Sequence, residues 1–324
     1  MGWLDSLFQA GKNSLSAIPA SIRPGALRRA KNDEDLFDEA FQRKLEHLAL
    51  VSRRVFSGRM RAERRTKKSG SGVEFADHRD YQPGDDFRTL DWNVYQRFDR
   101  LLVRLYEEEE DLAIYFIVDA SGSMAYGDRK KLRYAKTLCA ALAYVGLANL
   151  DRVTIVSTND QVMGRMPETR GKARIFKVFR FLADLEPKGV TDLEDALKSF
   201  AAQHKRRGLA VLLSDLYDPK GFEQGINVLR YNNFDPFVIH LVDPAEAKPK
   251  LGGDLLLYDC ETGDEREVTV TARILEKFAK EHASYLASVE KFCSGKQVPY
   301  VTADINTPFD ELILRIFRRG GFLR

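Results

Sequence analysis

Several features that would place the chain in a membrane or an oxidising compartment are missing. No apolar run approaches the ~20 residues that a membrane-spanning helix needs, and the N-terminus has no apolar signal-peptide core. The three cysteines, Cys139, Cys260 and Cys293, are far apart in the sequence and form no C-x-x-C pair. We therefore expect a cytoplasmic protein.

The common motifs of nucleotide and ester chemistry are also missing. The sequence has no G-x-x-x-x-G-K-[ST] motif, so any dependence on ATP must come from a partner. It has no G-x-S-x-G turn, and none of the five histidines is placed by the sequence as the base of a serine hydrolase. The net charge of +3 over 324 residues is small, and we expect no nucleic-acid partner.

The sequence does contain enough apolar material for a large core. A hydrophobic content of 44% with 31% charged residues is typical of a globular protein. Composition and periodicity divide the chain into three parts. These are a flexible segment, 1–33, a region of helix and β-turns, 34–110, and an α/β domain, 111–324.

The first residues allow two interpretations. Gly2 and Ser6 fit a myristoylation pattern, but so short a pattern matches mostly by accident. The apolar residues nearby can form an amphipathic helix that docks on the protein or lies on a membrane; they are Trp3, Leu4, Leu7, Phe8 and Leu15. We favour the docked or mobile helix, and membrane contact stays the alternative.

The region 34–110 opens with a helix and a basic run. Apolar residues at helical spacing predict one buried stripe, made of Leu36, Phe37, Phe41, Leu45, Leu48 and either Leu50 or Val51. The basic run 53–68 is opposed only by Glu63 and has no aromatic residue except Phe56. We expect this run to face solvent or an acidic partner rather than nucleic acid.

A group of charged and aromatic residues surrounds the sequence "QPGDD". Pro83 and Gly84 suit the centre of a type II turn, because proline fixes φ and glycine permits a positive φ. The surrounding residues can form either a binding site or a structural set of ion pairs, and we favour the ion pairs. They are Arg79, Asp85, Asp86, Arg88, Trp92, Tyr95 and Arg97.

From residue 111 onward, apolar runs alternate with amphipathic periods. Strands are predicted at 112–119, 151–158, 209–218, 235–244 and 298–304, with helices at 128–149, 172–186, 189–208, 221–233, 272–291 and 310–319. A β-hairpin is predicted around 254–270. The fold class is therefore α/β, with a doubly wound, mostly parallel sheet covered by helices on both faces.

Hydroxyl and carboxylate residues fall where three predicted elements meet one edge of this sheet. Asp119, Ser121 and Ser123 follow the first strand, Thr191 opens a helix and Asp215 ends a later strand. Ligands of open α/β sheets sit outside the carboxyl ends of the strands. Oxygen donors without histidine or cysteine favour Mg²⁺, or a similar hard cation such as Mn²⁺ or Ca²⁺, over zinc or copper.

The order D-x-S-x-S, then threonine, then aspartate resembles the metal-ion-dependent adhesion site of von Willebrand factor A-type domains. Upstream, "GVEFADHRDYQPGDDFRTLDWNVYQR" together with "VDASGSM" resembles the bacterial family called domain of unknown function 58. The first resemblance implies metal ligation by Asp119, Ser121, Ser123, Thr191 and Asp215. Adhesion-type domains commonly place glycine after the second aspartate, whereas this chain has Leu216, so Asp218 competes with Asp215 as the outer carboxylate.

The resemblance implies a non-enzymatic interaction module that binds Mg²⁺ and recognises an acidic residue of a partner. It further implies that the partner is a MoxR-type AAA+ ATPase and that the role is chaperone-like or in assembly. Two alternatives remain. The polar residues can simply cap the following helices, or Asp119 can be the nucleophile of a Mg²⁺-dependent phosphohydrolase, although Ser121 stands where such enzymes carry an acid/base aspartate.

Overall fold

The structure is a computed structural model that describes residues 36–56, 65–69, 74–109, 112–249, 251–259, 261 and 263–319. The predicted N-terminal segment 1–33 lies outside these residues. No helix in the described part of the chain is long and apolar enough to cross a membrane.

A six-stranded sheet forms the centre of the molecule, in the order β11-β8-β7-β4-β5-β6. All neighbouring strands are parallel except β5 and β6. The strands are β4 (Ala113–Asp119), β5 (Arg152–Thr158), β6 (Val162–Arg170), β7 (Leu209–Ser214), β8 (Asp235–Val242) and β11 (Tyr300–Asp304). The predicted fold class is confirmed.

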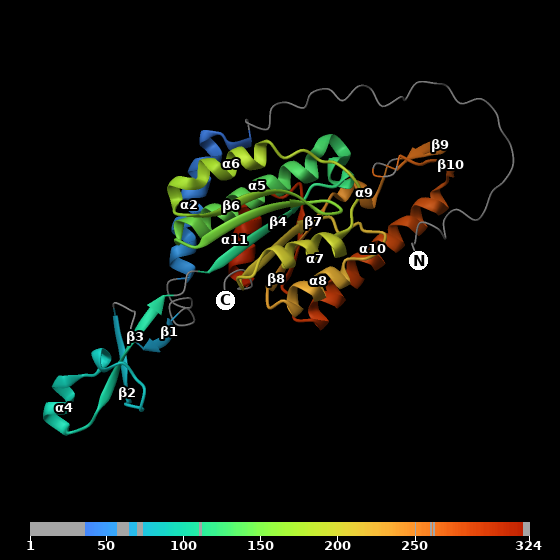
Figure 1. Ribbon diagram of the computed structural model, residues 1–324. Coiled ribbons are helices and arrows are strands. Elements are labelled where there is room, and N and C mark those ends of the chain that lie inside the picture. The colour runs from blue at the N-terminus through green and yellow to red at the C-terminus, as the bar shows by residue number, and fades with distance from the viewer. Residues whose placement is uncertain are drawn as a thin grey trace.

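Helices cover both faces of this sheet (Figure 1). One face packs against α2 (Glu39–Phe56), α5 (Tyr126–Ala148), α6 (Ile175–Ala183) and α11 (Phe309–Arg319). The other face packs against α7 (Leu193–Gln203), α8 (Glu223–Tyr231) and α10 (Ala272–Gly295). Alternate residues of β4 enter the two cores, because successive side chains of a strand point to opposite faces.

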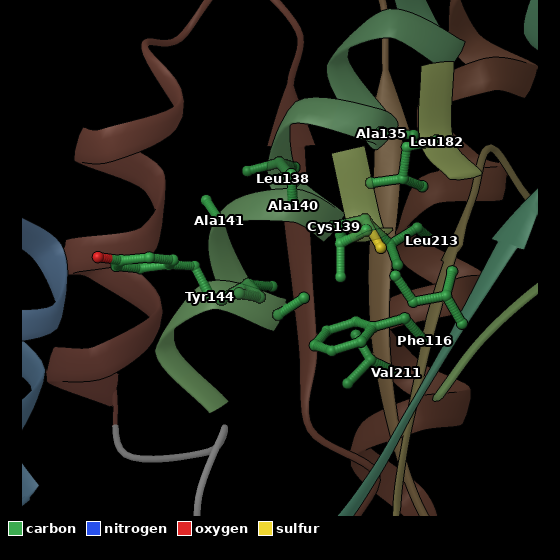
Figure 2. Close-up of a cluster of buried hydrophobic side chains, with 14 of the residues drawn as sticks. Phe116, Ala135, Leu138, Cys139, Ala140, Ala141, Tyr144, Leu182, Val211 and Leu213 are labelled. Carbon is green, nitrogen blue, oxygen red and sulfur yellow. The ribbon is translucent and has the colours of Figure 1, made fainter. Parts of the chain in front are cut away.

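Helix α5 lies between the sheet and the other helices of its face. Its small side chains, among them Ala135 and Cys139, allow close packing on Phe116 of β4 and on Val211 and Leu213 of β7 (Figure 2). On its outer side α5 meets α2, α6 and α11. A helix that is covered on two sides must be apolar over most of its circumference, which the residues after Ala135 are.

The edge strand β6 was not predicted. Along β6 only Met166 is buried, and the strand contains Pro167, which lacks a backbone N–H. A mostly exposed, proline-containing strand has neither an apolar run nor a regular alternation, and it is tolerated only because it lies at the edge of the sheet.

A small antiparallel sheet, β1-β3-β2, stands apart from the main body (Figure 1). It comprises β1 (Arg65–Ser69), β2 (Glu74–Asp80) and β3 (Leu102–Glu109), with η2 (Phe87–Thr89) and α4 (Trp92–Phe98) in the β2–β3 connection. Part of the basic run is therefore a strand, and its register sets Lys67 opposite Glu107. Residues 57–64 of that run lie outside the described residues.

The predicted helix at the start of the 34–110 region belongs to the main body rather than to the small sheet. Phe37, Phe41, Leu45 and Leu48 of the predicted stripe are buried in the core that contains α5 and α11. Leu50, one of the two alternatives for the last position of the stripe, is exposed. The domain boundary predicted after residue 110 thus separates α2 from the core in which it packs.

The turn around "QPGDD" and one ion pair of the predicted set, Arg79 with Asp85, are present. The Asp85 amide donates to the Gln82 carbonyl at 3.0 Å, and Gly84 has φ of 108°, as a type II turn requires. Arg79 donates to both carboxylate oxygens of Asp85, at 2.8 and 2.6 Å. The sequence did not single out Asp91, which binds His78 and Arg104 and is the centre of a second cluster.

The predicted β-hairpin is confirmed, and it lies beyond the short helix α9 (Pro244–Ala247), on the side where α10 begins (Figure 1). Its strands are β9 (Gly253–Tyr258) and β10 (Glu265–Val270), paired antiparallel. Thr271 caps α10 directly after β10, so the hairpin is continuous with a long helix that packs on the main sheet.

Candidate functional site

Asp119 is the last residue of β4 and is fully buried. One carboxylate oxygen accepts from the Ser121 amide at 2.9 Å, and the other accepts from the Ser214 hydroxyl at 2.5 Å. Ser214 ends the neighbouring parallel strand β7. The carboxyl ends of β4 and β7 are therefore tied together through this one side chain.

Ser121 and Ser123 follow in the loop and in η3 (Gly122–Ala125). Their hydroxyl oxygens are 3.0 Å apart, and the Ser123 hydroxyl donates to Asp215 Oδ1 at 3.3 Å. Four of the five predicted ligands, Asp119, Ser121, Ser123 and Asp215, are thereby joined in one cluster.

Thr191 reaches the cluster through a residue that was not predicted, Glu261 of the β9–β10 hairpin. The Thr191 hydroxyl donates to Glu261 Oε1 at 2.6 Å, and the Thr191 amide donates to Glu261 Oε2 at 3.0 Å. The Ser123 amide donates to Glu261 Oε1 at 3.3 Å. One carboxylate thus bridges two of the loops that carry the predicted ligands.

Asp218, the alternative outer ligand, is not part of this cluster. Its two carboxylate oxygens accept from the backbone amides of Leu193 and Lys220, each at 2.7 Å. Burial raises the pKa of Asp218 above its usual value. Asp218 therefore holds the start of α7, and the geometry favours Asp215 for the second carboxylate.

The N-caps of helices α5, α7 and α8 do not come from the five predicted ligands, although Asp218 accepts from the first amide of α7. Helix α5 starts after Ala125 and α8 after Phe222, both without a side-chain cap, and α7 is capped by Asp192. The alternative in which these polar residues only cap the next helices therefore does not hold for α5, α7 or α8.

A buried lysine on α5 also contacts the cluster. Lys131 Nζ lies 2.6 Å from Asp215 Oδ2 and 2.7 Å from Glu246 Oε1 of α9. Burial by itself would lower the pKa of Lys131, but the two carboxylates outweigh it, so the pKa is raised and the ammonium stays charged. Lys131 thus pairs with Oδ2 of Asp215, while Oδ1 of Asp215 accepts from the Ser123 hydroxyl.

Asp119 has no such cation. Burial, and then the nearby charge of Asp215, raise the pKa of Asp119 to about 7, against the hydrogen bonds from Ser214 and Ser121. All the groups that donate to it in the described structure are uncharged. The negative charge of Asp119 is therefore only partly compensated by this chain.

The backbone after Asp215 has an unusual conformation. Leu216 is buried with φ of 58°, in the left-handed region that favours glycine. Its amide donates to the Ser214 hydroxyl, and its carbonyl accepts from the Tyr285 hydroxyl of α10 at 2.5 Å. The sequence lacks glycine here, yet the backbone adopts a conformation suited to glycine.

The donors fit a hard cation by their chemistry, because all of them are oxygens. Among the described residues, no group of three or more His, Cys, Asp or Glu side chains is arranged to hold a metal ion, so a cation here would depend on the hydroxyls. The Thr158 hydroxyl, on the residue in register with Asp119 on β5, is buried with no hydrogen-bond partner in the described structure. A buried hydroxyl without a partner and a carboxylate whose hydrogen-bond donors are all uncharged therefore lie at the same edge of the sheet in the described structure.

The sheet order and the helices on both faces define a doubly wound α/β protein with a mostly parallel sheet. The chain belongs to the family described as "Protein of unknown function DUF58", whose model matches residues 77–287. The resemblance to that family is confirmed.

The chain is also similar to other proteins and to solved structures. Uncharacterized protein Mb1516 of Mycobacterium bovis is 27% identical over 315 residues, which cover 95% of this chain and 98% of the relative. A crystal structure of BatB from Bacteroides thetaiotaomicron, described as a conserved hypothetical protein, has 15% identity and a TM-score of 0.39, covering 64% of this chain and 96% of that one. An aerotolerance-related membrane protein from Bacteroides fragilis has 18% identity and a TM-score of 0.41, covering 64% and 99%.

Proposed function

We propose that this protein is a non-enzymatic interaction module that binds Mg²⁺, or Mn²⁺ or Ca²⁺, at the carboxyl edge of its sheet and recognises an acidic residue of a partner protein. One observation supports this above all others. Asp119, Ser121, Ser123 and Asp215, from separate strand ends, meet in a single hydrogen-bonded cluster, and Thr191 joins it through a carboxylate.

The chain's own residues divide the work. Asp119, Ser121, Ser123, Thr191 and Asp215 would hold the cation, which supplies an electrophilic centre for an incoming carboxylate. Ser214 orients the Asp119 carboxylate, and Lys131 holds Asp215 through its Oδ2 atom. Because hydroxyls outnumber carboxylates among the proposed ligands, the cation would keep affinity for one more negative oxygen.

We further propose that the partner is a MoxR-type AAA+ ATPase, that the role is chaperone-like or in assembly, and that the complex works in the cytoplasm. The support is the family to which the chain belongs, together with a sequence that has no nucleotide-binding motif of its own. No nucleic acid is involved in this proposal.

Calorimetric titration with MgCl₂ tests the cation site. We expect binding to the native protein that is lost in Asp119→Ala and strongly weakened in Ser121→Ala, while circular dichroism shows both variants to be folded. Asp215→Asn and Asp218→Asn form a matched pair. Only Asp215→Asn should weaken binding, since Asp218 is occupied by backbone amides.

Two results would contradict the proposal. Either no heat of binding for Mg²⁺, Mn²⁺ or Ca²⁺ with the native protein, or equal binding by native and Asp119→Ala proteins, would remove the cation site. Co-purification with the MoxR-type ATPase of the same genome, with and without chelator, tests the partner. Recovery that is unchanged by chelator and by Asp119→Ala would separate that complex from this site.

The rival function, a phosphohydrolase with Asp119 as nucleophile, has less support. Both Asp119 oxygens are engaged by hydrogen bonds and the side chain is fully buried. A nearby surface pocket touches the site loop only at Ala120 and includes none of the predicted ligands in its lining. Mg²⁺-dependent hydrolysis of p-nitrophenyl phosphate that disappears in Asp119→Asn would reverse this preference.

A further inference from the structure

The carboxylate of Glu261 contacts two of the residues that would hold the proposed cation, Thr191 and Ser123. It accepts hydrogen bonds from the Thr191 hydroxyl and amide and from the Ser123 amide. Two of these donors belong to Thr191 and one to Ser123, residues of two different loops of the proposed cation site. Glu261 is 138 residues from Ser123 and 70 from Thr191, so the contact is made by the fold and not by a local turn.

The hairpin turn presents Glu261 to these donors. The Asp259 side chain accepts from the Glu261 amide at 2.8 Å. The Gly263 amide donates to the Asp259 carbonyl at 3.0 Å, and Gly263 has φ of 76°, which only glycine adopts without strain. These contacts at Asp259 and Gly263 flank Glu261, whose side chain is directed at the site.

The hairpin buries few of its side chains. Among the residues from 251 to 269 whose side chains the structure describes, none is buried, and Leu255, Glu261 and Val268 are half-buried. An element with few buried apolar groups opens at low free-energy cost. Its base is different, since Val270 is buried and α10 is fixed to the loop after β7 by Tyr285. The hairpin can therefore lift its tip while its base stays in place.

We propose that Glu261 is an intramolecular ligand that closes the strand-end site of the free protein, so that a partner must displace it with its own carboxylate. The idea depends on the proposed function, because it assigns to Glu261 the position of the partner's acidic residue. A tethered carboxylate acts at an effective concentration of ~mM, so it excludes weak acidic ligands and yields to strong ones.

Acetate, the simplest carboxylate, tests this competition. In ¹⁵N-labelled protein with saturating MgCl₂, the amide signals of Ser123 and Thr191 report directly on the site. In Glu261→Ala we expect these signals to shift at acetate concentrations about tenfold lower than in the native protein. The matched control is Glu267→Ala, an exposed carboxylate of the same hairpin, which should behave as the native protein does. Acetamide should shift neither set of signals.

Hydrogen exchange provides a second, ligand-free measurement. Glu261→Ala, and separately Thr191→Val, should accelerate amide exchange in β9 and β10 while leaving β4 and β7 protected. Acetate affinity and hairpin exchange in Glu261→Ala that both match Glu267→Ala would overturn the inference.

The failure of this inference can be told apart from failure of the proposed function. If Mg²⁺ binding is lost in Asp119→Ala but Glu261→Ala responds to acetate like the native protein, the cation site is supported and the role of Glu261 as an intramolecular ligand is contradicted. If the native protein and Glu261→Ala both fail to bind any divalent cation, the proposed function falls and this inference falls with it.

Discussion

Two buried or nearly buried aspartates show opposite ways of handling charge. In the small sheet, Asp91 binds the Arg104 guanidinium and the His78 ring, each at 2.9 Å, and hydrogen bonds from these two side chains and from a backbone amide hold its pKa well below its usual range. At the edge of the main sheet, Asp119 binds only uncharged donors, and burial with the charge of Asp215 raises its pKa.

The difference shows which cluster is complete. The Asp91 cluster contains its own cation, Arg104, so it stabilises the connection between β2 and β3 without an external cation. The Asp119 cluster has three carboxylates in hydrogen-bonded contact with its hydroxyls and amides, while its buried ammonium, Lys131, serves Asp215 and Glu246. An external cation therefore has more to gain at Asp119 than at Asp91.

The largest expected effect comes from removing the one buried cation of the main-sheet cluster. Lys131→Met keeps most of the apolar stem but removes the ammonium that pairs with the buried Asp215 and the half-buried Glu246. We expect a loss of about 3–5 kcal/mol in the free energy of unfolding, measured by urea denaturation in chelator. Lys130→Met is the control, because Lys130 is exposed. Equal stabilities of the two variants would contradict the assignment.

The pH dependence of stability should differ between the two aspartates. With chelator present, folded Asp119 keeps its proton up to a pH of about 7, whereas the unfolded chain releases it near pH 4. The folded state thus binds more protons across this window, so the free energy of unfolding falls as pH rises from 4 to 7, by a few kcal/mol at most.

Asp119→Asn should flatten that part of the pH profile, and it should exceed the native protein in stability at pH 8 in chelator. Saturating MgCl₂ should oppose the loss in the native protein and should do nothing for Asp119→Asn. A native profile in chelator that rises between pH 4 and 7 in parallel with that of Asp119→Asn would show that the Asp119 carboxyl is not protonated in the folded protein.

A smaller effect should reveal the backbone strain beside Asp215. Leu216→Gly loses the buried side chain but relieves the left-handed backbone, whereas Leu216→Ala loses nearly as much side chain and keeps the strain. We expect Leu216→Gly to be more stable than Leu216→Ala by about 1 kcal/mol in thermal unfolding. At Leu213, a buried residue of β7, the order should be reversed. The same order at both positions would argue against strain at Leu216.

The smallest expected effect concerns Asp91. Its lowered pKa contributes stability that is present above pH 4 and is lost as pH falls further, the opposite sign to Asp119. Amide exchange in β2 and β3 should therefore accelerate on acidification in the native protein and be nearly independent of pH in Asp91→Asn, after correction for intrinsic rates. Parallel behaviour of the two proteins would remove the contrast between the clusters.

Much of the fold could be predicted because the buried strands are continuous apolar runs. The first predicted strand, 112–119, corresponds to β4, and Asp119 falls at its end as expected. The edge strand β6 escaped prediction since one buried residue leaves no periodic signal. Helix α2 was predicted by its apolar stripe, but a stripe does not say which surface it covers. The prediction therefore grouped α2 with the region 34–110, whereas it packs in the core of the main sheet.

The candidate site was predicted in part for a similar reason. Residues at strand ends converge because parallel strands end at one edge, which sequence order alone predicts. The burial of Lys131 had a weak signal in the sequence, because Lys131 lies four residues before Ala135 and seven before Leu138, at the spacing of one helix face. Glu261 had none, because it is one of several acidic residues around a hairpin turn, and only the three-dimensional structure selects it.

The position of α2 has a practical consequence for anyone who trims this chain. The small sheet is an insertion in the sequence between α2, which ends at Phe56, and β4, which starts at Ala113. The elements on both sides of this insertion pack in the same core. Starting expression at residue 111 would strip α2 from α5 and α11 and uncover an aromatic seam around Phe179 and Phe309. To remove the small sheet without disturbing this core, the residues between α2 and β4 should be replaced by a short linker.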